Sequence, residues 1–116
     1  MRGLGRLVAN KVLPHPEQAE LREIFVERWS ENDPKAYTET MAALGRWRSR
    51  ERLPKITCPM CVVAGDEDFF PMELKEDLVS RVPDARLVVV ANSGHLTPID
   101  QLEKFNKIVE DFLAEH

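Results

Sequence analysis

Two short apolar runs in the second half of the chain constrain its fold more than any other feature. Residues 60–64 (MCVVA) end at Gly65, and residues 86–91 (RLVVVA) end at a polar loop. Short runs rich in β-branched residues and bounded by turn residues are typical of strands buried on both faces, as in parallel sheets. Apolar residues spaced among charges predict a helix over 72–81 between them. We therefore predict two parallel strands joined by a right-handed helical crossover.

A second amphipathic segment begins at Pro98 and continues to the C-terminus, which predicts a helix packed on the same sheet. Its apolar residues are Leu102, Phe105, Ile108, Val109, Phe112 and Leu113. Two parallel strands are not a self-sufficient sheet, because parallel sheets are normally covered on both faces and extended by further strands. We therefore expect strands to be missing and at least one apolar strand edge to be unpaired.

The first 55 residues carry helical patterns. Pro16 and the acidic residues after it are typical of a first helical turn, and Asp33 before Pro34 is typical of an N-cap. These patterns predict two amphipathic helices that form a hairpin. Its large apolar residues, Trp29, Tyr37, Met41 and Trp47, are interpreted as helix core, with the wall of a substrate pocket as the alternative. Residues 53–59 contain two prolines and predict an extended connector.

Composition excludes several classes of protein. The 116 residues carry a net charge of −4, which argues against a nucleic-acid partner, and they correspond to one small domain or a piece of one. No apolar run is long enough to span a bilayer, and the N-terminus does not resemble a secretory signal. Two cysteines, Cys58 and Cys61, are too few for a disulfide scaffold, so we expect a cytoplasmic protein in which they are structural. The basic residues between Arg46 and Lys55 are interpreted as a solvated helix end rather than an anion site.

The residues best suited to catalysis follow the two predicted strands. Asp66, Glu67 and Asp68 come after the first strand, and Ser93-Gly94-His95 comes after the second. Ligands of open α/β sheets bind outside the carboxyl ends of the strands, so both loops are expected at one site. A carboxylate bonded to one imidazole nitrogen leaves the other nitrogen to act as a general base. The alternative is a solvated acidic turn beside an isolated polar histidine.

At these residues the sequence resembles the C-terminal half of the α/β-hydrolase family. Residues 53–65 resemble the approach to a late strand of that fold, which leads into a G-x-x-D loop and places Asp68 at the triad acid. The Gly94-His95 dipeptide resembles the turn that carries the triad histidine, and residues 31–47 resemble cap helices. The resemblance implies an α/β fold with a helical cap or lid segment over 1–52. The C-terminal β-α-β-α part of the core would then cover 53–116.

The sequence departs from that family in two places. Pro71 lies three residues after Asp68, where the family commonly has its proline or valine four residues after the acid, so Asp66 stays an alternative acid. No G-x-S-x-G elbow is present, so the chain lacks both the nucleophile and the oxyanion hole formed beside it. None of Ser30, Ser49, Ser80 and Ser93 has the elbow spacing, and an elbow for an aspartate nucleophile is absent too.

The resemblance implies a hydrolase of ester or related bonds that acts on a small-molecule substrate without a metal or other cofactor. This chain alone would be inactive, because a triad without its nucleophile loses most of its rate. Missing N-terminal strands supplied separately would complement it. A different hypothesis is a non-catalytic interaction module that pairs its exposed strand edge with another copy or another chain.

Overall fold

The two apolar runs form parallel strands, as predicted from the sequence. In the computed structural model, which describes residues 1–116, strand β1 is Met60–Gly65 and strand β2 is Ala85–Val90. They pair in parallel, with Met60 opposite Ala85 and Gly65 opposite Val90. The second strand begins and ends one residue earlier than expected. The sheet has only these two strands, so each has one edge without a neighbouring strand.

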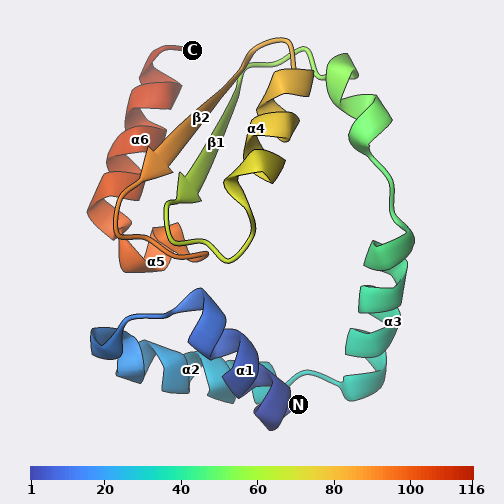
Figure 1. Cartoon of the computed structure of the whole chain (residues 1–116), viewed down its shortest axis with the longest axis vertical. Helices are drawn as coiled ribbons and strands as arrows, with labels where there is room; N and C mark the ends of the chain where they lie inside the picture. Colours follow the sequence, from blue (N-terminus) through green and yellow to red (C-terminus); the bar gives the residue numbers. More distant parts are fainter. The chain divides into compact units, whose positions relative to one another are not determined.

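Helices lie on both sides of this sheet (Figure 1). Helix α4, Met72–Arg81, forms the crossover between the strands over the residues predicted for it. Helix α6, Leu102–Ala114, lies along the sheet, and its residues Phe105, Ile108, Val109 and Phe112 surround a small hollow with Cys61 and Val63 of β1. The sheet is therefore a layer between two helices.

The single C-terminal helix predicted from Pro98 is two helices in the structure. Helix α5, Thr97–Asp100, is one turn long, and α6 begins at Leu102. Between them Gln101 has φ −133° and ψ 51°, outside the helical region, so the helix is interrupted there. The interruption leaves Asp100 at the end of α5, close to the loop that follows β2.

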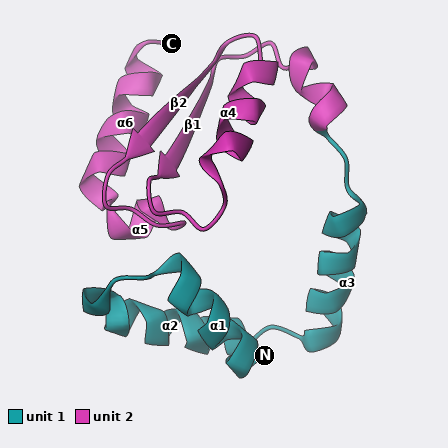
Figure 2. Cartoon of the chain, viewed as in Figure 1, with its two compact units in different colours: residues 1–49 teal, residues 50–116 magenta.

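The chain divides into two compact units, residues 1–49 and residues 50–116 (Figure 2). The first unit contains α1 (Arg2–Val12), a 3₁₀ helix (Pro16–Gln18), α2 (Ala19–Ser30) and α3 (Pro34–Arg46). The second contains a 3₁₀ helix (Arg50–Lys55) followed by the strands and the remaining helices. No helix in either unit has the length and apolarity needed to cross a membrane.

The predicted hairpin of α2 and α3 is wrong, because the helix that packs along α2 is α1. Gly5 of α1 is buried against Trp29, and a Cβ at this glycine would lie 2.9 Å from the Trp29 Cβ. Ala9 and Val12 of α1 and Val26 of α2 are buried in the same unit. The periodicity of α2 correctly indicated an apolar face but not which helix would cover it.

Helix α3 begins as predicted but contributes little to the core. The Asp33 side chain accepts a hydrogen bond from the Ala36 N–H at 2.7 Å, which is the expected N-cap. Tyr37 contacts Trp29 with the ring centroids 5.5 Å apart. Farther along the helix, Met41 is 43% exposed and Trp47 is 64% exposed. The interpretation of these two residues as helix core is therefore wrong for this chain.

The extended connector predicted for residues 53–59 is wrong in its first part. Residues 53–55 belong to the 3₁₀ helix Arg50–Lys55, and only residues 56–59 lead to β1 outside a helix. Proline fixes φ near −65°, which suits a 3₁₀ helix as well as an extended chain, so Pro54 does not exclude this turn. The Arg50 guanidinium also donates to the Asp77 carboxylate of α4 at 2.8 Å.

Candidate active site

The loop after β1 turns sharply and buries the side chain of Asp68. The Asp68 N–H donates to the carbonyl of Gly65 at 3.3 Å, and the Phe70 N–H donates to Asp68 Oδ1 at 3.0 Å. These two bonds turn the chain immediately after the strand. The Asp68 side chain is only 7% exposed. A carboxylate this buried must be paired with donors, since burial of an unpaired charge is very costly.

The loop after β2 packs directly against the end of β1. Asn92 adopts φ 56°, a left-handed conformation that asparagine tolerates better than most residues, and it reverses the chain. The Ser93 carbonyl then accepts from the Glu67 N–H at 2.8 Å. A Cβ at Gly65 would lie 2.2 Å from the Ser93 and Gly94 carbonyl oxygens, so only glycine permits this approach. The strand end and the second loop are thus in backbone contact.

This contact brings together the two residues singled out in the sequence. His95 Nδ1 lies 3.0 Å from Asp68 Oδ1, and the histidine side chain is 38% exposed. The rings of Phe69 and Phe70 lie 4.9 and 5.5 Å from the imidazole. No residue of the chain hydrogen-bonds His95 Nε2. The arrangement can therefore hold a proton on Nδ1 while Nε2 accepts one from another group.

A lysine that the sequence analysis did not consider completes the environment of the acid. Lys75 Nζ lies 2.7 Å from Asp68 Oδ2 and donates to the Phe70 carbonyl at 2.6 Å. Burial by itself raises the pKa of Asp68, but the hydrogen bonds from Lys75, the Phe70 N–H and His95 outweigh it and hold that pKa below its usual range. Lys75 lies one turn into α4, among exposed charged residues. Nothing in its position along the sequence distinguishes it from those neighbours.

The carboxylate of Asp100 anchors the loop that carries His95. Asp100 at the end of α5 accepts from Ser93 Oγ at 2.8 Å and from the Gly94 N–H at 2.8 Å. The Thr97 hydroxyl also lies 2.8 Å from Ser93 Oγ. Ser93 and Thr97 are buried, so this network anchors the two residues that precede His95. Asp100 was missed in the sequence because it lies in a short helical turn that has no periodic pattern.

The structure places the alternatives that the sequence left open in different surroundings. Asp66 Oδ1 accepts from the Ser93 N–H at 3.2 Å and has no contact with His95, whereas Asp68 contacts His95 directly. Ser93 is fully buried with its hydroxyl bonded to Asp100, so it is not placed as a nucleophile. The structure contains no group of three or more His, Cys, Asp or Glu side chains arranged to hold a metal ion.

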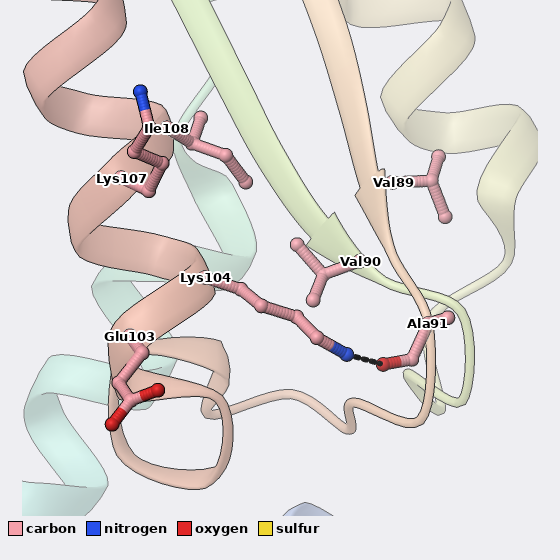
Figure 3. Close-up of a pocket in the computed structure, with 7 residues that line it drawn as sticks. All are labelled: Val89, Val90, Ala91, Glu103, Lys104, Lys107 and Ile108. Atoms are coloured by element: carbon pink, nitrogen blue, oxygen red, sulfur yellow. Dashed lines mark hydrogen bonds between the residues drawn. The ribbon is translucent and has the colours of Figure 1, made fainter.

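A hollow of the second unit lies elsewhere, between the end of β2 and α6 (Figure 3). It has a volume of about 550 Å³ and is lined by Val89, Val90, Ala91, Glu103, Lys104, Lys107 and Ile108. Lys104 donates to the Ala91 carbonyl at 3.4 Å, and Lys107 is paired with Asp111. Neither Asp68 nor His95 lines it, so the candidate site is the loop pair at the carboxyl ends of the strands.

Comparison with known proteins gives hydrolases as relatives. No protein-family model matches the chain. It is 35% identical over 74 residues to a 2-hydroxy-6-oxononadienedioate/2-hydroxy-6-oxononatrienedioate hydrolase of a Pseudomonas species, a match that covers 63% of this chain and 26% of that protein. The chain thus spans about a quarter of that curated relative.

Solved structures share the fold over nearly the whole chain. An esterase from Exiguobacterium antarcticum matches 97% of this chain and 42% of its own, with a TM-score of 0.85 at 24% identity. The enol-lactonase from Burkholderia xenovorans LB400 matches 98% of this chain and 45% of its own, with a TM-score of 0.87 at 23% identity. In each case less than half of the larger protein is represented here.

Proposed function

We propose that this chain, which belongs to the α/β-hydrolase family and corresponds to part of that fold, carries the triad acid and histidine of a hydrolase of ester or related bonds. The observation that supports the proposal best is the pairing of Asp68 Oδ1 with His95 Nδ1 at 3.0 Å, at the carboxyl ends of two parallel strands. Residues 1–52 would form the cap of that hydrolase, and residues 53–116 would form the C-terminal part of its core.

His95 would act as the general base. Its Nε2 would take the proton of a nucleophile supplied by the rest of the fold as the nucleophile attacks the substrate carbonyl, and would later return it to the leaving group. Asp68 would keep the imidazole in the tautomer that leaves Nε2 unprotonated and would stabilise the imidazolium that forms. The His95 side chain is 38% exposed and is bordered by Phe69 and Phe70, which supports the approach of a small-molecule substrate to the imidazole.

The isolated chain is expected to show no turnover, because it contains no nucleophile elbow. A triad that lacks its nucleophile loses rate on the order of 10⁶-fold. The purified protein should therefore not hydrolyse a p-nitrophenyl ester above the rate in buffer. Hydrolysis by the isolated chain that disappears in His95→Ala would overturn this part of the proposal.

The roles of the two residues can be tested in a chimera. The 116 residues would replace the matching segment of the Exiguobacterium antarcticum esterase, so that the retained part supplies the nucleophile. In an active chimera, Asp68→Asn should lower kcat by a factor on the order of 10⁴, and His95→Ala by a factor on the order of 10⁶. Asp66→Asn is the matched control and should keep most of the activity, because Asp66 does not contact His95.

Two results would contradict these assignments. Loss of activity in Asp66→Asn together with full activity in Asp68→Asn would transfer the role of the acid to Asp66. An active chimera that retains its rate in His95→Ala would remove the histidine from the mechanism. Circular dichroism of each variant would show that the compared proteins are equally folded.

A second candidate function is an interaction module, and the unpaired strand edges favour it. Each strand of the two-stranded sheet has one edge without a neighbour, and Val89 in β2 is 48% exposed. Such an edge can pair with another copy of the chain or with a separate chain that carries the missing strands. Sedimentation at several concentrations tests self-association, and a monomer that melts cooperatively would argue against it. Recovery of activity on mixing with an N-terminal part would instead indicate complementation of an enzyme.

A further inference from the structure

Lys75 holds the oxygen of Asp68 that does not face the histidine. Its ammonium lies 2.7 Å from Asp68 Oδ2, while Oδ1 lies 3.0 Å from His95 Nδ1 and accepts the Phe70 N–H. The Lys75 side chain is 14% exposed and that of Asp68 is 7% exposed, so solvent screens this pair little. The same ammonium donates to the Phe70 carbonyl at 2.6 Å, which attaches the acid loop to α4.

These contacts decide how the carboxylate plane is oriented. Rotation about the last side-chain torsion of aspartate has broad minima, so backbone packing alone leaves the plane poorly defined. Here Lys75 binds one oxygen and the Phe70 N–H binds the other, so the plane is held from both ends. Asp68 Oδ1 is thereby directed at the imidazole nitrogen as a hydrogen-bond acceptor.

The charge of Lys75 has a second consequence. A hydrogen bond between two charged groups is stronger than one from a neutral donor, so the ammonium holds Oδ2 more firmly than a neutral side chain would. Without it the carboxylate can turn away, and the Nδ1–H of His95 loses its acceptor. The single proton of the neutral imidazole can then lie on Nε2, the nitrogen that a general base needs to keep free.

We propose that Lys75 is a positioning residue that acts through Asp68 to keep the His95 proton on Nδ1 and the lone pair on Nε2. The proposal rests on the proposed function for its catalytic meaning, but the tautomer itself can be measured in the 116-residue chain without any activity. Lys75 does not touch His95, so its whole effect passes through the two oxygens of Asp68.

The measurement is an ¹⁵N spectrum of the imidazoles, because protonated and unprotonated ring nitrogens have well separated shifts. Spectra are recorded at about pH 8.5, which is well above the ordinary histidine pKa of about 6.5. The chain has three histidines, and loss of signals in His95→Gln assigns those of His95. The wild-type chain should show a protonated Nδ1 and an unprotonated Nε2 at this residue.

Lys75→Met should shift His95 toward the Nε2-protonated tautomer, and Lys75→Arg, which keeps the charge, should restore the wild-type pattern. The matched control is Lys107→Met, which removes a lysine paired with Asp111 on the exposed surface of α6 and should change nothing at His95. A merely structural role of Lys75 would change stability without moving the tautomer in the folded variant. An unchanged tautomer in folded Lys75→Met would therefore overturn the proposal.

If Lys75→Met does not fold, Lys75→Gln is the second neutral variant. Its side chain can still donate to the Phe70 carbonyl but has no charge. Amide spectra of β1 and β2 show which variants are folded. If neither neutral variant folds while Lys75→Arg does, Lys75 is required for folding and the proposal is rejected. If the tautomer changes as expected while the chimera stays active in His95→Ala, the positioning role stands and the hydrolase mechanism fails.

Discussion

Gly65→Ala is the substitution for which the structure makes the most definite prediction. The glycine is the last residue of β1 and is buried against the loop that carries His95. An added Cβ would lie 2.2 Å from two carbonyl oxygens, those of Ser93 and Gly94, and 2.5 Å from the Ser93 carbonyl carbon. These are backbone atoms, so no side-chain rotation relieves the overlap. The loop would have to retreat by about 1.2 Å to reach the 3.4 Å at which ordinary contact begins.

The energetic cost follows from what that movement breaks. Overpacking of a well-packed site costs about 1–3 kcal/mol. The Glu67 N–H to Ser93 carbonyl bond and the Ser93 N–H to Asp66 bond lie on the moving segment, and each net hydrogen bond contributes about 1 kcal/mol. We therefore expect Gly65→Ala to lower the free energy of unfolding by about 3–5 kcal/mol. This is a large share of the roughly 5–15 kcal/mol available to a small domain.

The assay must follow the second unit specifically. Both tryptophans, Trp29 and Trp47, lie in residues 1–49, so their fluorescence does not report on the sheet. Urea unfolding is therefore followed by the amide signals of Val63 and Val88, which pair across β1 and β2. The midpoint for these signals should fall sharply in Gly65→Ala.

Gly45→Ala is the matched control, since nothing lies within 4 Å of a Cβ built at this helical position of α3. It should leave the sheet transition unchanged and stabilise its own helix by at most about 1 kcal/mol. A Gly65→Ala protein with the wild-type midpoint for the sheet would refute the inferred contact between the two loops.

Three further predictions concern side-chain hydrogen bonds. The pKa of Asp68 is held below the ordinary 3.8. Its contribution to stability is therefore present above about pH 4 and is lost as the pH falls through that lowered pKa. Asp68→Asn should flatten this dependence of stability on pH, measured by urea unfolding at pH values between about 5 and 2. Asp100→Ala leaves the buried Gly94 N–H without its acceptor and should cost about 1–3 kcal/mol, measured by the same sheet signals. Asp33→Ala removes the N-cap of α3 and should cost about 1 kcal/mol in a tryptophan-fluorescence melt, whereas an unchanged melt would show that the cap contributes nothing.

Local patterns predicted most of the second unit. Continuous β-branched runs identified both strands, because a strand buried on two faces needs apolar residues at every position. The same topology placed Asp68 and His95 on neighbouring loops, since parallel strands end at one edge of the sheet. Their 3.0 Å contact is thus the outcome expected from two sequence positions 27 residues apart.

Local patterns did not predict the contacts between helices, strands and loops. Periodicity gave α2 an apolar face, but α1 covers that face because Gly5 lets the two helices approach closely at Trp29. Likewise, nothing in the spacing of Lys75 or Asp100 separates them from ordinary surface charges. Their partners are a carboxylate and a backbone N–H that the folded loops place within hydrogen-bond distance.

The difference between the features that the sequence predicted and those that it did not has a physical basis. Residue type and spacing specify which segments become helices and strands and which ends of the strands carry polar loops, because those choices depend on neighbours in the chain. The orientation of the Asp68 carboxylate depends instead on a lysine in the next helix, and the position of the His95 loop depends on Gly65 and Asp100. Those distances are properties of tertiary packing, which brings charges and backbone groups together at spacings that no local pattern encodes.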